Sequence, residues 1–191
     1  MRKLILRMLL TLDGVAAGDE KGPLDMVDYS DEGSWTDIFD TLKSVDAMLL
    51  GGGSYREYLG YWKGVPANPK ASASERKFAE IAMRTPHFVL SRTAGDVSKE
   101  FPNARLLEGG VDGIAHLKGQ PGGDILMWGG PTAAAAVIDA GLFDEYHLET
   151  HPAIAGRGKK LFEKVRKVHR LRQIDTKTTP SGVTILKYAS A

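Results

Sequence analysis

Short apolar runs alternate with amphipathic segments along most of the chain. The apolar runs predict buried strands over Lys3–Leu10, Ala47–Leu50, Pro86–Leu90, Asp124–Trp128 and Tyr146–His151, with a weaker strand over Arg105–Leu107. Apolar residues at helical spacing predict helices over Ser34–Ser44, from Ser54 to about Tyr61, and over Ser72–Met83, Val111–Leu117 and Pro131–Ala140. Two final strands, Leu171–Thr178 and Val183–Tyr188, are joined through Pro180–Gly182 as an antiparallel hairpin.

This order of elements predicts an α/β fold. We expect a three-layer αβα sandwich around a mixed, mostly parallel sheet, with the antiparallel C-terminal hairpin at one edge. No repeat or linker interrupts the pattern, so a single domain over residues 1–191 is expected. Ser34-Trp35-Thr36-Asp37 is typical of a capping box, with Asp in place of Glu, that opens the first helix. The acidic segment Ala17–Gly33 contains Gly and Pro and predicts an exposed loop.

Composition excludes several classes of function. The 25 basic and 24 acidic residues nearly balance, which argues against nucleic-acid binding. The chain has no cysteine, so disulfides, thiolate chemistry and cysteine-based zinc sites are excluded. Arg7 interrupts the first apolar run and Asp13-Gly14 follows it, which is unlike a secretory signal. No run is long enough to span a membrane, so we expect a soluble, cytoplasmic protein with no membrane partner.

Histidines and lysines offer no clear site of their own. His147 and His151 share a face of a predicted strand but lie roughly 13 Å apart at about 3.3 Å per residue, too far to share one ion. We therefore expect no metal site and interpret both as surface or hydrogen-bonded residues. The basic stretch from Lys159 to Arg172 is interpreted as a solvated face.

Three predicted strand ends carry the candidate chemistry: Gly51–Ser54, Ser91–Thr93 and Gly129–Thr132. Ligands of open α/β sheets bind at the carboxyl ends of the strands. In the last segment the glycines allow a phosphate to approach the backbone, Pro131 suits the first helical position, and the helix N-terminus supplies amide donors. Alone, the Gly-Gly pair is equally well explained as a tight turn, and Ser91-Arg92-Thr93 is better explained as a solvated turn. Three such strand ends in one chain nevertheless favour a nucleotide site. Neither Gly-x-Gly-x-x-Gly after the first strand nor a P-loop motif is present.

The same segments resemble a known family. The matching motifs are Leu12-Asp13-Gly14, Leu49-Leu50-Gly51 with Ser54-Tyr55, Ser91-Arg92-Thr93, Gly129-Gly130, Gly141-Leu142-Phe143-Asp144-Glu145-Tyr146, His151-Pro152 through Gly156-x-Gly158, and Leu161-Phe162. In this order they resemble the dihydrofolate-reductase-like proteins of the RibD C-terminal reductase type, over nearly the whole chain. The zinc deaminase half of the bifunctional riboflavin enzyme is missing, since no Pro-Cys-x-x-Cys occurs.

The resemblance implies an NADPH site along the carboxyl edge of the sheet. By that resemblance, Gly51 and Ser54 approach the phosphates, and Asp13-Gly14 border the nicotinamide. Ser91, Arg92 and Thr93 would lie near the adenosine 2′-phosphate. The residues implied to hold the pyrophosphate are Gly129, Gly130, Pro131 and Thr132. Relatives often carry Arg after the glycine at position 51, whereas this chain has Gly52, which leaves Arg92 as the chief guanidinium for the 2′-phosphate.

The resemblance also implies an activity, which is hydride transfer from NADPH to a heterocyclic small molecule. In dihydrofolate reductases an acidic residue of the first long helix grips the pterin, and the matching position is near Trp35. Asp31, Glu32 and Asp37 are neighbours, interpreted as two solvated loop acids and a helix cap. By the resemblance, Asp13 would border the nicotinamide and Glu149 would lie on a strand facing the cofactor cleft, and these two are the candidate catalytic residues.

Four readings of the function remain open at this point. The favoured one is a riboflavin-pathway reductase similar to 5-amino-6-(5-phosphoribosylamino)uracil reductase. The alternatives are a dihydrofolate-reductase-like activity and a nucleotide-binding homologue without turnover. An α/β interaction domain in which the glycine turns are only turns is a further reading. The family commonly pairs, so we also expect a homodimer.

Overall fold

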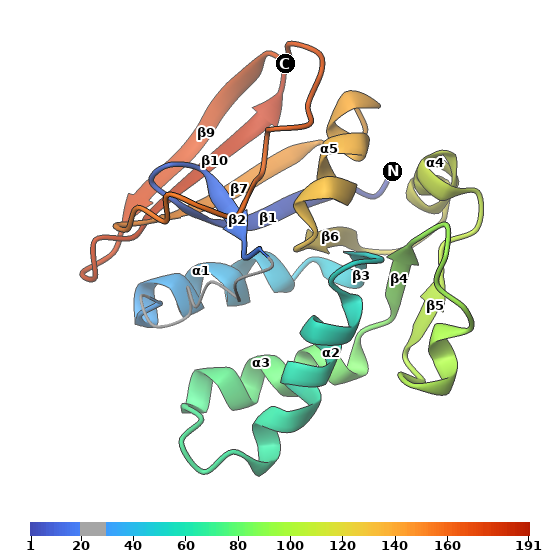
Figure 1. Cartoon of the computed structure of the whole chain (residues 1–191), viewed down its shortest axis with the longest axis horizontal. Coiled ribbons are helices and arrows are strands. Elements are labelled where there is room, and N and C mark those ends of the chain that lie inside the picture. The colour runs from blue at the N-terminus through green and yellow to red at the C-terminus, as the bar shows by residue number, and fades with distance from the viewer. Residues whose placement is uncertain (20–29) are drawn as a thin grey trace.

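A mixed sheet of eight strands forms the centre of the molecule (Figure 1). The structure is a computed structural model and describes residues 1–19 and 30–191. The strands lie in the order β5-β4-β3-β6-β1-β7-β10-β9. Their bounds are Ala104–Leu106 (β5), His87–Leu90 (β4), Val45–Gly51 (β3), Asp124–Trp128 (β6), Leu4–Thr11 (β1), Glu145–His151 (β7), Thr184–Ser190 (β10) and Leu171–Thr178 (β9). Neighbours from β5 to β7 run parallel, while β10 is antiparallel to β7 and to β9. The predicted mixed sheet with an antiparallel C-terminal hairpin is confirmed.

Helices cover both faces of this sheet, which gives the expected three layers (Figure 1). Helices α4 (Gly110–Gly119) and α5 (Pro131–Asp139) pack against one face. Helices α1 (Glu32–Leu42), α2 (Tyr55–Gly64) and α3 (Ala73–Arg84) pack against the other. Short 3₁₀ turns, η2 (Val65–Ala67) and η3 (Val97–Lys99), connect elements on that second face. Among the described residues, no helix combines the length and the apolar character needed to cross a bilayer.

The alternation of side chains along β1 explains how one strand serves two different layers. Successive side chains of a strand point to opposite faces of the sheet. Leu4, Leu6, Met8 and Leu10 therefore join the apolar core beneath α4 and α5. Ile5 joins the core beneath α1 and α3, and the next residue on that face is Arg7, which is only 1% exposed. A charged residue thus lies at the centre of a buried strand.

The start of α1 differs from the prediction. Asp31, rather than Ser34, is the N-cap, and its carboxylate accepts hydrogen bonds from the backbone amides of Gly33 and Ser34. The helix therefore begins two residues before the predicted capping box, and Ser34 is buried in its first turn. Asp37 is not a cap either, because its carboxylate points to the sheet and pairs with two basic side chains described below.

Two short strands were missed by the hydrophobic pattern. Strands β2 (Val15–Ala17) and β8 (Lys159–Lys160) form a small antiparallel sheet beside the main one. Strand β8 is a pair of exposed lysines, so it carries no period-2 signal. The loop predicted over Ala17–Gly33 lies for the most part, at residues 20–29, outside the described residues.

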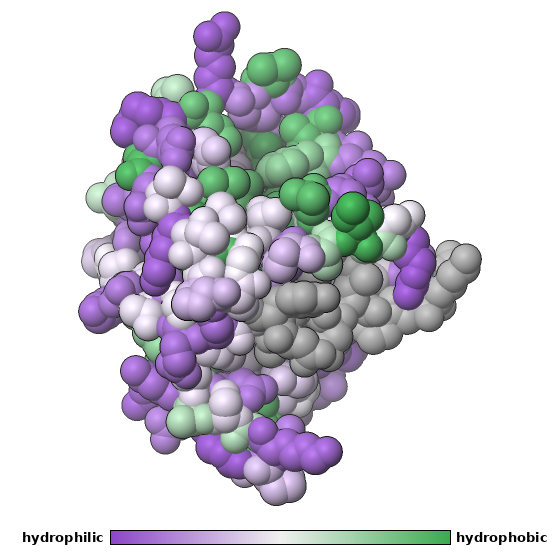
Figure 2. All heavy atoms as spheres, turned by 90° about the vertical axis from the view of Figure 1, so that its left-hand side faces the viewer, coloured by the Kyte–Doolittle hydropathy of each residue, from purple (hydrophilic) through white to green (hydrophobic). Residues whose placement is uncertain are grey.

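Strand β9 is an edge strand that is exposed along its whole length. Leu171 and Ile174 of this strand are among the exposed large apolar residues. Figure 2 shows hydrophobic side chains gathered in the upper half of the face that it presents. An exposed edge of this kind is compatible with pairing, and the homodimer stays a prediction.

Candidate functional site

Glycines bring the carboxyl ends of β3 and β6 into contact. Gly51 ends β3, while Gly129 and Gly130 follow β6 with φ of +73° and +78°, in the left-handed region that favours glycine. A Cβ atom on Gly130 would lie 3.1 Å from Ser54 Oγ and 3.2 Å from Gly51 Cα. These four residues therefore form a surface of bare backbone and one hydroxyl, which we call the glycine strip. A phosphate could approach backbone amides there.

The neighbouring strand end, after β4, extends the glycine strip. Ser91 Oγ accepts hydrogen bonds from the backbone amides of Thr93 (3.2 Å) and Ala94 (3.0 Å), so this hydroxyl shapes its own turn. A Cβ atom on Gly52 would lie 2.5 Å from Ser91 Oγ and 2.6 Å from Ser91 Cβ. The chain thus has no room for a side chain at position 52 while Ser91 keeps this place. Arg92 is exposed and makes no ion pair or hydrogen bond with the described part of the chain.

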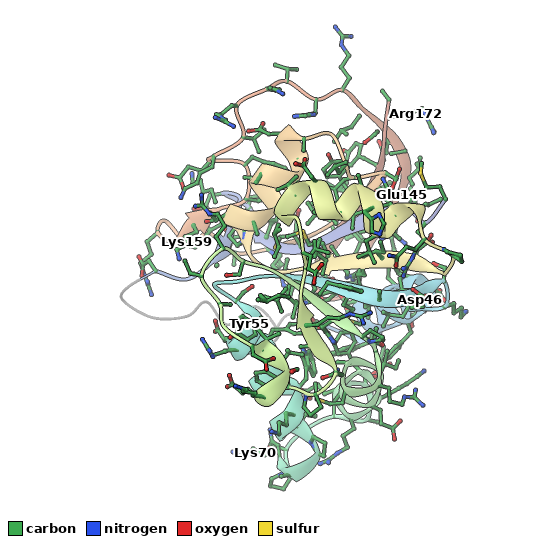
Figure 3. All side chains as sticks on the ribbon, turned by 90° about the vertical axis from the view of Figure 1, so that its right-hand side faces the viewer. Asp46, Tyr55, Lys70, Glu145, Lys159 and Arg172 are labelled. Carbon is green, nitrogen blue, oxygen red and sulfur yellow. The ribbon has the colours of Figure 1, made fainter. Side chains whose placement is uncertain are left out.

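The N-terminus of α5 provides donors beside the glycine strip. Gly130 is the N-cap, no side chain caps the helix, and Pro131 occupies the first turn. The first amides of a helix lack carbonyl partners within it and carry its positive dipole end. A hollow beside this terminus is lined by Pro131, Thr132, Lys159, Lys160, Glu163 and Lys164. In Figure 3, Lys159 of this hollow lies on one side of the molecule, and Glu145, the first residue of strand β7, lies on the other side. The donors and the excess positive charge favour an anion such as a pyrophosphate.

A buried ion network lies on the other side of the sheet, beneath α1. The Arg7 guanidinium donates from Nη1 to Asp37 Oδ2 at 2.6 Å and from Nη2 to Glu149 Oε2 at 2.5 Å. Lys187 Nζ of β10 lies 2.5 Å from Asp37 Oδ1. Burial by itself raises the pKa of Asp37, but the charges of Arg7 and Lys187 outweigh it and hold that pKa below its usual range. The four charged groups of this network therefore balance one another.

Two histidines border the ion network from β7. His147 Nε2 lies 3.0 Å from Glu145 Oε2, and His151 Nε2 lies 3.5 Å from Glu149 Oε1. Burial lowers the pKa of both histidines, so they are neutral at pH 7. Both are buried. Within residues 1–19 and 30–191, no three potential metal-ligating side chains gather at one point.

An aromatic cavity adjoins the ion network. The space between its walls is about 370 Å³, which includes open solvent at its mouth. Its lining residues are Arg7, Leu9, Ser30, Ser34, Trp35, Ile38, Trp62, Phe78, Trp128 and Glu149. All three tryptophans of the chain are among them. Trp128 pairs in register with Arg7 and directly precedes Gly129, so the cavity borders the glycine strip.

The two candidate catalytic residues have different surroundings. Glu149 lines the aromatic cavity and is 2% exposed. Asp13 lies at the turn after β1, where its carboxylate accepts hydrogen bonds from Thr11 Oγ1 (2.6 Å) and from the amides of Ala155 and Gly156. These bonds lower the pKa of Asp13 to about 2. Asp13 is therefore anionic at neutral pH and holds the loop after β7, while the catalytic role of either residue stays a prediction.

We expect the free energy of unfolding to depend less on pH, in the acidic range, in Asp13→Asn than in the wild type. The pKa of Asp13 lies near 2 in the folded protein, against an ordinary value of 3.8. Its ionised carboxylate therefore stabilises the fold fully above about pH 5, and this contribution is lost as the pH falls toward 2. The difference in urea midpoint between wild type and Asp13→Asn should shrink over that interval. A constant difference would contradict the assignment, and Asp112→Asn on the exposed side of α4 is the control.

The strand ends that the sequence singled out lie close together, but several residues beside them were not recognised from the sequence. Gly51, Ser54, Gly129 and Gly130 meet as the topology required, and Ser91 meets Gly52. Arg7 and Ser34 of the cavity were not recognised as site residues, because nothing local marks a strand arginine as buried beside a cavity. The lysines beside Thr132 were interpreted as a solvated face, since their place depends on a contact between distant segments.

Comparisons with known proteins agree with this fold. A family model described as the RibD C-terminal domain matches residues 2–185. The uncharacterized protein YyaP of Bacillus subtilis (strain 168) is 31% identical over 189 residues, covering 98% of this chain and 94% of the relative. A putative riboflavin biosynthesis protein from Shewanella sp. PV-4 matches with a TM-score of 0.74 and 20% identity, over 99% of each chain.

Two further solved structures share the fold. A diaminohydroxyphosphoribosylaminopyrimidine deaminase/5-amino-6-(5-phosphoribosylamino)uracil reductase from Thermotoga maritima matches with a TM-score of 0.68 and 16% identity, over 100% of this chain and 57% of that one. A dihydrofolate reductase from Enterococcus faecalis, complexed with NADP(H), matches with a TM-score of 0.61 and 13% identity, over 98% and 96% of the two chains. At these identities the likeness establishes the dihydrofolate-reductase-like fold.

Proposed function

Because the chain belongs to the RibD C-terminal domain family, we propose that it is an NADPH-dependent reductase acting on a heterocyclic small molecule of the riboflavin-pathway type. The observation that carries this proposal is that the glycine strip and the aromatic cavity are adjacent, because Trp128 lines the cavity and the next residue, Gly129, belongs to the strip. One region suits the phosphates of a dinucleotide and the other suits a flat ring. Their adjacency is what hydride transfer between two bound molecules requires.

In this proposal, different residues of the chain would bind the phosphates of the cofactor and the ring of the substrate. Gly129, Gly130 and the first amides of α5 would hold the pyrophosphate, with the lysines of the neighbouring hollow adding positive charge. Arg92 would meet the adenosine 2′-phosphate. The cofactor supplies the hydride when bound. The tryptophans would orient the substrate ring and exclude water from it.

The dihydrofolate-reductase-like alternative is less favoured by the composition of the cavity. From α1, the cavity receives Ser34, Trp35 and Ile38, and none of these is acidic. Asp37, the buried acid of α1, is held by Arg7 and Lys187 instead. A pterin would therefore lack the acidic partner from the first helix. Binding without turnover is the remaining alternative.

An absorbance assay of NADPH oxidation tests the proposal. We expect turnover with 5-amino-6-(5-phosphoribosylamino)uracil or its dephosphorylated form, and little with dihydrofolate. Turnover with dihydrofolate alone would favour the first alternative. NADPH binding without oxidation in the presence of any of the three compounds would favour the second.

A further inference from the structure

Three polar atoms of the residues that line the aromatic cavity are buried without a hydrogen-bond partner among the described residues. They are Arg7 Nε and Glu149 Oε1 of the ion network and the hydroxyl of Ser34, in the first turn of α1. The other atoms of the same groups are engaged, since both terminal nitrogens of Arg7 donate to carboxylates and Glu149 Oε2 accepts one of these bonds. His151 Nε2, at 3.5 Å from Glu149 Oε1, is at the limit of hydrogen-bonding distance. The cavity wall thus has one charged donor, one charged acceptor and one hydroxyl without a hydrogen-bond partner.

The charges around Arg7 and Glu149 determine whether the cavity favours a charged or an uncharged ligand. Arg7 and Lys187 carry two positive charges, and Asp37 and Glu149 carry two negative ones, so the network is balanced. The two neighbouring histidines are neutral because burial lowers the pKa of each. A charged ligand would bring an uncompensated charge against a wall whose other residues are aromatic, aliphatic or serine. An uncharged ligand avoids this cost.

The rings set the shape of the ligand. Trp35, Trp62 and Phe78 form one aromatic cluster, with Trp62 and Phe78 at 4.4 Å between ring centroids, and Trp128 lies 5.6 Å from Phe78. Such walls favour a planar aromatic ring, which stacks on or packs edge-to-face against them.

We infer that Arg7 and Glu149 are the specificity-determining residues of the cavity, and that they recognise a flat, uncharged ring by an edge with a hydrogen-bond acceptor beside an N–H donor. The cis-amide edge of a lactam has this arrangement. Its carbonyl oxygen accepts from Arg7 Nε, and its N–H donates to Glu149 Oε1. Asp37 is a positioning residue that holds the Arg7 guanidinium, and Lys187 pairs with Asp37. This inference rests on the proposed function, because it names the substrate class of the same cavity.

Calorimetric titration with two matched ligands tests the inference on the unmodified protein. The probes are 2-quinolone, which has the lactam edge, and N-methyl-2-quinolone, which lacks the N–H. A hydrogen bond to a charged acceptor predicts that 2-quinolone binds at least about tenfold more tightly. Equal dissociation constants, or no binding of either compound, would overturn the inference.

A pair of variants separates recognition from structural support. Glu149→Gln replaces the charged acceptor by a neutral amide, so the ratio of the two dissociation constants should fall to about threefold or less. Glu145→Gln makes the same change on the same strand outside the cavity and should leave the ratio unchanged. A ratio that survives in Glu149→Gln would overturn the role of Glu149. If this variant fails to fold, the ligand pair on wild type still decides the question.

Titration of NADPH in the same experiment distinguishes the two proposals. If 2-quinolone binds more tightly than N-methyl-2-quinolone but NADPH does not bind, the proposed reductase function is refuted and the role of Arg7 and Glu149 stands. If NADPH binds but the two quinolones bind equally, the role of Arg7 and Glu149 is refuted and the proposed reductase function stands.

Discussion

Arg7→Met is expected to lower the free energy of unfolding by about 3–5 kcal/mol, the usual cost of leaving a buried charge without its partner. The guanidinium contacts two buried carboxylates, those of Asp37 and Glu149, and lies 5.7 Å from the ring centroid of Trp128. Without it, Glu149 loses its cationic partner, whereas Asp37 keeps Lys187. For a domain of this size, the loss corresponds to a decrease of about 6–20 °C in melting temperature.

Urea unfolding of Arg7→Met and Arg56→Met measures this effect against a matched control. Arg56 also forms an ion pair, with Glu100, but both partners are largely exposed. Exposed pairs contribute little, so the control should lose less than about 1 kcal/mol. Equal losses in the two variants would show that the network beneath α1 does not stabilise the fold as described.

Arg92→Ala is expected to weaken NADPH binding by about 10–150-fold and to leave NADH almost unchanged. Charge-assisted hydrogen bonds of a guanidinium to a phosphate contribute about 1.5–3 kcal/mol, and each 1.4 kcal/mol is about tenfold in affinity. Arg92 is exposed after β4 and forms no ion pair or hydrogen bond with the described residues. A side chain at position 52 could not compensate, because Ser91 fills the space beside Gly52.

Dissociation constants for both dinucleotides, measured at fixed salt, separate the possible roles of Arg92. Arg172→Ala is the control, since it removes one exposed guanidinium from β9, at the opposite edge of the sheet from β4 (Figure 3). An unchanged affinity for NADPH would mean that Arg92 is a solvated turn residue. Parallel losses for NADPH and NADH would mean that it supports the shared pyrophosphate or the fold.

The fold was predictable because its signals are local or topological. Apolar runs predicted the main strands, with bounds within about two residues, and parallel topology then brought Gly51 and Gly129 to one edge of the sheet. The N-cap of α1 was predicted at Ser34, three residues after its actual position at Asp31. The reason is that Ser34 and Asp37 fit the capping pattern as well as Asp31 does. Local sequence cannot tell which of several polar residues faces the helix end.

The cavity was less predictable because it is made by long-range contacts. Arg7 and Glu149 lie on adjacent strands but far apart in the sequence, and Lys187 reaches Asp37 from the C-terminal hairpin. Arg7 was recognised as an interruption of the first apolar run, yet its role depends on carboxylates that only the folded sheet supplies. The register Arg7↔Trp128 between β1 and β6 connects the cavity to the glycine strip.

The most direct test of the account is calorimetric titration of the unmodified protein with NADPH and NADH. The glycine strip, the free amides of α5 and Arg92 predict that NADPH binds with micromolar or tighter affinity and that NADH binds more weakly. Absence of binding for both dinucleotides would contradict the assignment of this edge of the sheet as a nicotinamide-cofactor site.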